Sequence, residues 1–240
     1  MSVPRTNLFL DSLSAESREL LMRQCTELDL PLKKSLYEAE NTPRYAYFLT
    51  SGIASVVTAM EEGSTAEVGL IGREGVVGSF HLLGPAKVHT SFIQLEATAL
   101  RMPFSGLMRA FRSNEEIRDR TLEFVQEQAV SLSLLAGCNR LHESEERLAR
   151  WLLMAQDRTG TDVLDFTQEF LGMMLGARRT TVTVIAGVLQ RSGLIEYRRG
   201  KVTILDQESL EAAACDCYKL TKDLYTGLYS QALPRKLEID

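Results

Sequence analysis

One stretch near the C-terminal end, residues 175–195 (LGARRTTVTVIAGVLQRSGLI), constrains the fold more than any other part of the sequence. Its residues 180–185 are six consecutive β-branched residues, a composition typical of a strand. A strand would mix polar and apolar side chains on one of its faces. A helix would instead gather Val182, Ile185 and Leu189 on one face and leave the threonines on the other. The periodicity therefore predicts a helix with a buried side and a polar outer side.

The segments on both sides of this helix extend the pattern. Thr167 can cap a short helix with an apolar stripe, and Gly176 suits a tight turn between the two helices. After the second helix, the sequence LIEYRRGKVTIL indicates a hairpin with a basic tip. Helix, turn, helix and hairpin in this order predict a winged helix-turn-helix.

We expect this unit to bind double-stranded DNA. Arg179, at the start of the second helix, can donate two hydrogen bonds to guanine, and threonines suit phosphates or the thymine methyl group. Basic side chains at the hairpin tip suit phosphates, which add affinity without sequence information. The residues expected at the DNA are Thr167, Gln168, Arg178, Arg179, Thr180, Thr181, Thr183, Val184, Arg198, Arg199 and Lys201.

The charge distribution supports a polyanionic partner. The whole chain carries a net charge of −5, which by itself argues against nucleic acid. Residues 167–205, however, hold six basic and two acidic side chains, a local charge of +4 that leaves −9 for the rest. The alternative is that these basic residues are only solvated surface. Their grouping at two matching places in one motif favours DNA.

Residues 28–102 have the pattern of a β domain. Short apolar runs (YAYFLTSG, IASVVTAM, AEVGLIG, GVVGSFHLLG and SFIQLEATALRM) are separated by Gly, Pro, Asn or charged turns, with EEGST as a hairpin tip. Strands at this spacing predict an antiparallel sandwich or barrel. Residues 8–24 are expected to precede it as one amphipathic helix with Ser14 as a plausible N-cap.

Residues 114–139 predict one long helix, because they contain no Pro and a single Gly. Apolar residues spaced by three and four form a heptad seam, suited to pairing with a second copy of the chain. The alternative is a helix face that lies on its own β domain; we favour self-dimerisation. A separate helix with an acidic first turn is expected over residues 142–158. The seam residues are Leu122, Val125, Ala129, Leu132 and Ala136.

In this order, residues 8–205 resemble the cyclic-AMP receptor protein/FNR family of bacterial transcription regulators. The pattern T-Q-E-F-L-G-x-x-L-G-x-x-R-x-T-V, from Thr167 to Val182, matches the helix-turn-helix of that family. The resemblance implies an α+β fold with an N-terminal double-stranded, jelly-roll-like β-roll, a long dimerisation helix and a C-terminal winged helix-turn-helix. It implies an effector-sensing domain over residues 1–113, the dimerisation helix over 114–140, and a DNA-binding domain with a helical tail over 141–240.

The resemblance also implies a function. A homodimer would bind a palindromic operator under the control of an effector, with RNA polymerase as a further partner. In many family members a Glu stands where this chain has Thr180, and a base-contacting Arg stands where it has Val184. Because Arg179 matches the family's guanine-contacting arginine, we expect the operator to keep that guanine. Thr180 and Val184 favour thymine methyl contacts elsewhere in the site.

The chain also departs from the family at the effector site. By resemblance, members that bind cyclic nucleotides carry a Glu for the ribose and an Arg for the cyclic phosphate. Ser79 and His89 stand at those places here, and neither replaces a bidentate arginine on a phosphate. We therefore expect an effector other than cyclic AMP or cyclic GMP, in a pocket that includes Gly78, Ser79, His89 and Thr90. The alternative is a scaffold roll in a constitutive or partner-controlled regulator.

The sequence predicts no catalytic residue, no metal site and no resident cofactor. An FNR-type iron–sulfur cluster needs several cysteines near the N-terminus, where only Cys25 lies. His81 or His89 could ligate a haem, but packing or surface roles are more common for a histidine in a β domain. Cys215-x-Cys217 could be half of a metal site, but no His or Cys lies near it in sequence, which favours small packed thiols.

An enzyme of the cupin type is the alternative from another functional class. Such an enzyme needs two or three histidines and a carboxylate around a metal, and the three histidines of this chain lack the close His-x-His spacing. No apolar run reaches the about 20 residues that span a bilayer, and the N-terminus turns polar too soon for a signal peptide. We expect a cytoplasmic protein without membrane contact. The sequence leaves open where the tail beyond Leu205 packs.

Overall fold

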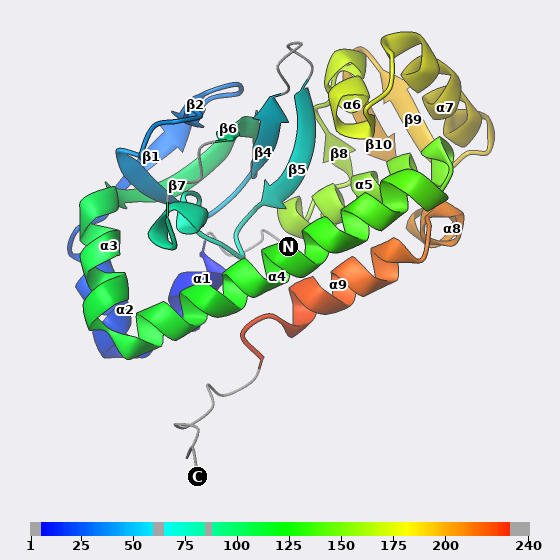
Figure 1. The fold of residues 1–240 in the computed structure, drawn as a ribbon. Helices are drawn as coiled ribbons and strands as arrows, with labels where there is room; N and C mark the ends of the chain where they lie inside the picture. Colours follow the sequence, from blue (N-terminus) through cyan, green and yellow to red (C-terminus); the bar gives the residue numbers. More distant parts are fainter. Residues whose placement is uncertain (1–5, 60–64, 85–87, 231–240) are drawn as a thin grey trace.

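The computed structural model describes residues 6–59, 65–84 and 88–230. Its first part is a roll of two antiparallel sheets, as the short apolar runs predict (Figure 1). One sheet has the strand order β1–β7–β3, and the other has the order β2–β6–β4–β5. The strands of the roll are β1 (Thr26–Leu30), β2 (Ser35–Tyr37), β3 (Tyr45–Leu49), β4 (Ile53–Ala59), β5 (Thr65–Ile71), β6 (His89–Leu95) and β7 (Ala97–Pro103).

The two sheets share an apolar core. Leu49 of the first sheet belongs to the same buried cluster as Val56 and Ile93 of the second. Phe124, from the long helix described below, is fully buried in this cluster. A Cβ atom at Gly75 would overlap the ring of Phe124, so only glycine lets the helix approach the roll this closely.

One predicted strand is wrong. The run GVVGSFHLLG forms a turn followed by the short 3-10 helix η1 (Ser79–Leu82). The reason is Gly78, whose φ of 100° lies in the left-handed region and turns the chain away from an extended path. The run SFIQLEATALRM forms two strands, β6 and β7, one in each sheet. The expected hairpin tip EEGST falls almost entirely on residues 60–64, outside the described residues.

The helix expected over residues 8–24 is two helices, α1 (Leu8–Asp11) and α2 (Ala15–Met22). Ser14 caps the second one, because its side chain accepts a hydrogen bond from the backbone N–H of Ser17. The chain therefore starts a new helix at the predicted cap instead of continuing the first.

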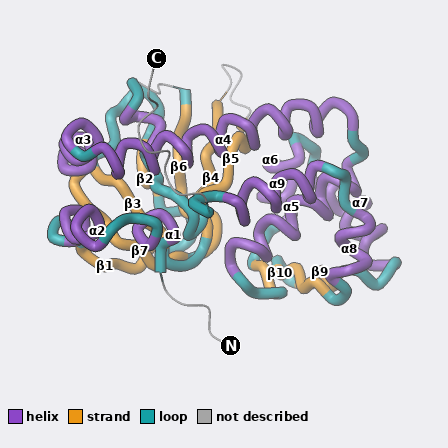
Figure 2. The backbone as a smooth tube through the Cα atoms, turned by 90° about the horizontal axis from the view of Figure 1, so that it is seen from below, coloured by secondary structure: helices purple, strands orange, loops and turns teal. Residues whose placement is uncertain are grey.

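The long helix is present. The helix α3 (Phe104–Ser113) leads into α4 (Glu115–Leu141), which Asn114 caps through the backbone N–H of Ile117. Figure 2 shows α4 crossing from the side of the strands to the side of the C-terminal helices. None of the described helices, α4 included, is both long and apolar enough to cross a membrane.

The C-terminal part is a compact group of helices with a small sheet of order β8–β10–β9. Trp151, Phe166, Leu171 and Val182 lie in its buried core. Two helices follow this sheet in the chain. The elements are α5 (Ser144–Thr159), β8 (Val163–Leu164), α6 (Gln168–Leu175), α7 (Arg179–Arg191), β9 (Ile195–Arg198), β10 (Lys201–Ile204), α8 (Gln207–Ala213) and α9 (Cys217–Gly227).

The tail beyond the small sheet packs on both halves of the molecule. Its helix α8 contacts α5, and α9 contacts α5 and lies alongside α4 (Figure 1). After α9, the hydroxyl of Tyr229 donates a 2.8 Å hydrogen bond to the backbone carbonyl of Glu74 in the roll. The tail thus joins the roll, the long helix and the C-terminal part.

Candidate functional site

The turn between α6 and α7 is built for close packing of the two helices. Thr167 caps α6 by accepting a 3.2 Å hydrogen bond from the backbone N–H of Phe170. Gly176 ends α6 in the left-handed conformation, with φ of 61°. Gly172 is also required, because a Cβ atom there would lie 2.8 Å from the carbonyl oxygen of Ala177. These features fix the angle at which α7 leaves the turn.

The two faces of α7 are those that the periodicity predicts. Val182, Ile185 and Leu189 are buried in the C-terminal core. The opposite face is exposed, and Val184 on it has 63% of its surface accessible to solvent. An exposed branched apolar residue among threonines and arginines suits contact with a thymine methyl group. The exposed candidate residues of this helix and its start are Arg178, Arg179, Thr180, Thr181, Thr183 and Val184.

A hydrogen bond that was not predicted from the sequence orients Arg179, the first residue of α7. The Nε–H of Arg179 donates a 3.2 Å hydrogen bond to the side-chain oxygen of Gln168 on α6. Because this bond uses Nε, the terminal nitrogens of the guanidinium group keep donors for a partner. Gln168 therefore acts as a positioning residue for the arginine that begins the second helix.

The hairpin β9–β10 carries the expected basic tip. Arg199 and Gly200 have φ values of 52° and 79°, and two adjacent residues with positive φ make the tight hairpin turn that matches strand twist. Arg198 and Arg199 are exposed. Lys201 is exposed too, but its Nζ lies 2.8 Å from the carboxylate of Asp165. The charge count over residues 167–205 stops short of Asp165, so it overstates the basic character of the hairpin.

The predicted dimer seam is uncovered in the single chain. Leu122 is 42% exposed, Ala129 and Ala136 are exposed, and Val125 and Leu132 are partly exposed. Phe124 points into the roll, and α9 packs on a further face of α4. The helix α4 therefore packs against its own chain on two faces, and its heptad face is left exposed.

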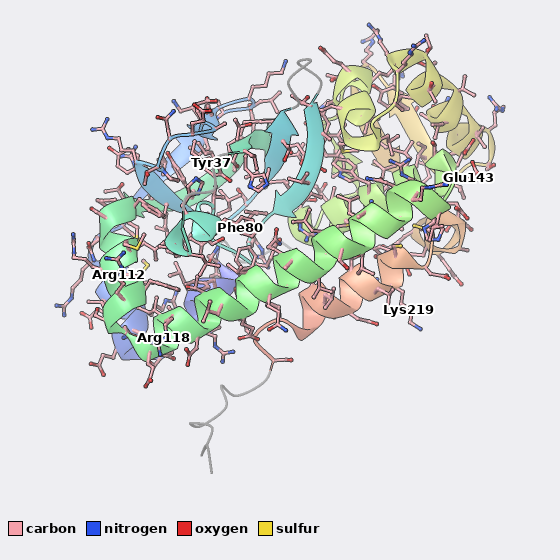
Figure 3. The ribbon with its side chains drawn as sticks, in the orientation of Figure 1. Tyr37, Phe80, Arg112, Arg118, Glu143 and Lys219 are labelled. Carbon is pink, nitrogen blue, oxygen red and sulfur yellow. The ribbon has the colours of Figure 1, made fainter. Side chains whose placement is uncertain are left out.

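Inside the roll, the expected effector residues meet a group of buried polar atoms. The side-chain oxygen of Ser79 and the Nδ1 atoms of His81 and His89 are buried and have no hydrogen-bond partner among the described residues. Burial lowers the pKa of both histidines, so their rings are neutral near pH 7. Phe80, labelled in Figure 3, lies beside this group, with its ring centroid 6.1 Å from that of His89. The surroundings suit a ligand with hydrogen-bonding groups better than an anion.

Thr90 lies apart from the other expected effector residues, in a cleft between the roll and α6. This cleft of about 550 Å³ is lined by Thr90, Phe92 and Gln94 on one side and by Phe170 and Met173 on the other. Gly78, Ser79 and His89 do not line it. Of the four expected pocket residues, the structure therefore gathers three near η1 and places Thr90 toward α6.

The comparisons with known proteins agree with this geometry. Residues 146–213 match the model of the Crp-like helix-turn-helix domain. The transcriptional regulator SdrP of Thermus thermophilus is 25% identical, over 75% of this chain and 89% of its own. Residues 146–213 therefore carry a Crp-like helix-turn-helix domain, and the chain is similar to transcription regulators of the CRP/FNR type. DNA binding follows from the domain that it carries.

Solved structures show the same fold over about four fifths of this chain. A CRP-family transcriptional regulator from Thermus thermophilus superimposes with a TM-score of 0.67 at 22% identity, covering 78% of this chain and 96% of its own. FixK2 from Bradyrhizobium japonicum superimposes with a TM-score of 0.68 at 14% identity, covering 80% and 98%. The β-roll, long helix and winged helix-turn-helix expected from the sequence are therefore confirmed as the fold.

Two further contacts were not predicted from the sequence. The indole N–H of Trp151 donates a 2.9 Å hydrogen bond to Glu67 of the roll. Arg158, also on α5, forms a 2.9 Å ion pair with Glu74, and both side chains are buried. Both contacts join the roll to the helix that precedes the helix-turn-helix. A fully buried charge is uncommon without a partner, but the sequence cannot say which charges are buried.

Proposed function

We propose that this regulator reads a palindromic DNA operator with the exposed face of α7, one helix from each protomer of a homodimer. The observation that carries the proposal is Arg179, exposed at the start of α7 and held by Gln168 while its terminal nitrogens remain available. An arginine in this position can donate two hydrogen bonds to guanine. Arg178, Arg198 and Arg199 add phosphate contacts.

Selection of bound sites from random DNA, followed by fluorescence anisotropy on the selected operator, tests this reading. Arg179→Ala should cost about 1–3 kcal/mol of binding free energy and relax the preference at one base pair of each half-site. Arg112→Ala on α3, which also removes an exposed arginine, is the matched control and should bind as the wild type does (Figure 3). Unchanged discrimination by Arg179→Ala would show that α7 is not the reading helix.

The homodimer part of the proposal is supported by the uncovered seam of α4. Two helices paired along it would place the two α7 helices about 34 Å apart, one turn of DNA, as a palindrome requires. Leu122→Glu should convert the dimer to a monomer in sedimentation velocity. Leu20→Glu on α2 is the control, because Leu20 and Leu122 have nearly equal exposures of 43% and 42%. A variant Leu122→Glu that stays dimeric would move the interface elsewhere.

For the effector, we propose a small polar molecule other than cyclic AMP, bound near η1. Support comes from the buried Ser79 and His89 atoms without partners among the described residues. Operator affinity measured with and without a metabolite extract, for the wild type and for Ser79→Ala, is the test. A response in the wild type that Ser79→Ala weakens supports the pocket. Equal affinities in both conditions favour the alternative, a constitutive regulator or one controlled by a partner such as RNA polymerase.

A further inference from the structure

Four potential metal ligands converge where α4 ends. Cys138 and His142 come from the end of α4. Cys215 lies in the connection between α8 and α9, and Cys217 is the first residue of α9. Their ligand atoms all lie within 4.8 Å of one another. The sulfur atoms of Cys138 and Cys215 are 3.5 Å apart, and the sulfur of Cys217 is 3.6 Å from Nδ1 of His142.

The local structure explains how these residues come together. Cys138 and His142 are four residues apart, so they lie on the same side of the last helical turn. The backbone N–H of His142 donates a 3.1 Å hydrogen bond to the carbonyl of Cys138 and ends the helix. On the other segment, the N–H of Tyr218 donates to the carbonyl of Cys215 at 2.9 Å as α9 begins. Since α9 lies alongside α4, the two pairs face each other.

We propose that Cys138, His142, Cys215 and Cys217 form a structural site for one zinc ion. Three cysteines and one histidine are a ligand set typical of closed, four-coordinate structural zinc sites. With zinc–sulfur bonds of about 2.3 Å, two sulfurs of a tetrahedral site lie about 3.8 Å apart, close to the separations found here. The three cysteines are 1%, 5% and 7% exposed, so the protein excludes solvent from the ion.

The charges near the site fit this assignment. Three thiolates and a neutral imidazole around Zn²⁺ give a net charge of −1, and the three thiol protons pass to solvent on binding. The buried guanidinium group of Arg150 interacts electrostatically with all three cysteines and offsets that charge. The sequence alone favours packed thiols for Cys215 and Cys217, since their partners lie more than 70 residues away in the chain.

Two other chemistries fit the arrangement less well. An iron–sulfur cluster is larger than a single ion, so its ligands would have to lie farther apart than these atoms do. A disulfide between Cys138 and Cys215 would use two of the four residues and give no reason for His142 and Cys217 to face them. The single ion uses all four.

The site lies where α4 meets the C-terminal part, so a bound ion would hold these two parts together. Glu143, labelled in Figure 3, directly follows His142 and caps α5, so the ligands stand at the junction of the long helix and the C-terminal part. A bound ion would clamp the α8–α9 connection onto this junction. If the chain binds DNA as proposed above, the ion would also fix the angle between the dimer helix and the helix-turn-helix, an effect that rests on that proposal.

The test uses the full-length protein and does not depend on DNA. Protein purified from medium with zinc should contain about one zinc per chain by mass spectrometry of the metals. Replacement by Co²⁺ should give the thiolate charge-transfer and tetrahedral d–d bands. A strong chelator should lower Tm, and added zinc should restore it, because an ion that binds only the folded state stabilises it.

Variants assign the ligands. His142→Ala and Cys215→Ser should each weaken zinc affinity at least tenfold, since even outer-shell partners contribute about 10- to 100-fold. Cys25→Ser is the matched control, because Cys25 is the one cysteine outside the group, and it should keep the zinc. His142 is only partly buried, so His142→Ala should fold even if the cysteine variant does not, which circular dichroism checks.

Three results would overturn the proposal. The first is protein without zinc whose Tm does not respond to added metal, and the second is iron with labile sulfide in place of zinc. The third is a Cys138–Cys215 disulfide in protein kept under reducing conditions, detected by peptide mass spectrometry. Loss of DNA binding with zinc retained would instead concern the proposed function, not the metal site.

Discussion

Glu67 of β5 accepts a 2.9 Å hydrogen bond from the indole N–H of Trp151 on α5. Ser55 and Gln94 donate to the other oxygen of the same carboxylate at 2.6 and 3.0 Å. Burial raises the pKa of Glu67 to about 7, although these donors oppose the shift. A contact between the roll and the helix before the helix-turn-helix therefore changes charge near neutral pH.

This shift predicts a dependence of stability on pH. The pKa of Glu67 is higher in the folded protein than its ordinary value of 4.5, so the folded state holds the proton more tightly. Its contribution to the free energy of unfolding is present at low pH and is lost as pH rises from about 4.5 to about 7. Glu67→Gln keeps an acceptor for Trp151 and carries no charge. The free energy of unfolding of Glu67→Gln relative to that of the wild type should be higher at pH 8 than at pH 5, by on the order of 3 kcal/mol.

Urea unfolding at a series of pH values measures this difference. Glu16→Gln, at an exposed glutamate of α2, is the control and should follow the wild-type curve. Parallel curves for wild type and Glu67→Gln would mean that Glu67 does not titrate in this range.

The ion pair between Arg158 and Glu74 predicts a large loss of stability when it is broken from one side. Glu74 is fully buried and Arg158 is 5% exposed. Arg158→Met would leave a buried carboxylate without its cation, at a cost of about 3–5 kcal/mol. The double variant Glu74→Gln, Arg158→Met should recover most of this loss. Chemical unfolding of the single and double variants gives the coupling energy.

The exposed pair of Arg23 with Glu19 is the matched control for this experiment. Arg23→Met should leave the free energy of unfolding unchanged within error, because exposed ion pairs contribute little. A double variant no more stable than Arg158→Met would show that the loss comes from packing of the arginine and not from the unpaired charge.

These contacts also show where sequence reasoning ends. The faces of α7, the cap at Thr167, the turn at Gly176 and the long helix follow from local periodicity, and all are found. The run around Gly78 failed as a strand because a left-handed glycine outweighs β propensity. The helices and strands could be predicted from the local sequence pattern, because the formation of each one depends on residues only a few positions apart in the chain.

The partners of buried polar groups, in contrast, could not be predicted from the sequence. Trp151 and Glu67 are 84 residues apart in the chain, and Cys138 and Cys215 are 77 apart. No periodicity connects residues at such distances, so the polar contacts between the roll and α5 and the cysteine–histidine group emerge only from the folded chain. The residues expected at the DNA could be named from the sequence because one continuous motif holds them. The ion pair of Lys201 with Asp165 was not predicted, because Asp165 lies just outside that motif.

The turn of the helix-turn-helix predicts opposite effects for two glycine substitutions. Gly172→Ala would place a Cβ atom 2.8 Å from a backbone oxygen and should cost about 1–3 kcal/mol of stability. Gly137→Ala in α4 meets no atom within 4 Å among the described residues and should stabilise by about 0.5–1 kcal/mol. Thermal unfolding compares the two. Equal effects would mean that the approach of α6 to the turn is looser than the structure has it.

The ion pair of Asp165 with Lys201 predicts a gain in DNA affinity when the acid is removed. Both side chains are 59% exposed, and the carboxylate of Asp165 forms an ion pair with the lysine that the hairpin β9–β10 would offer to a phosphate. Asp165→Asn should free Lys201, tighten binding to all DNA sequences alike, and steepen the slope of log K against log salt by about 1. Fluorescence anisotropy over a salt series measures both quantities. Asp29→Asn on β1 removes the same charge from an exposed site in the roll and should leave the slope unchanged. If the two variants change binding equally, the gain reflects net charge alone and Lys201 makes no phosphate contact.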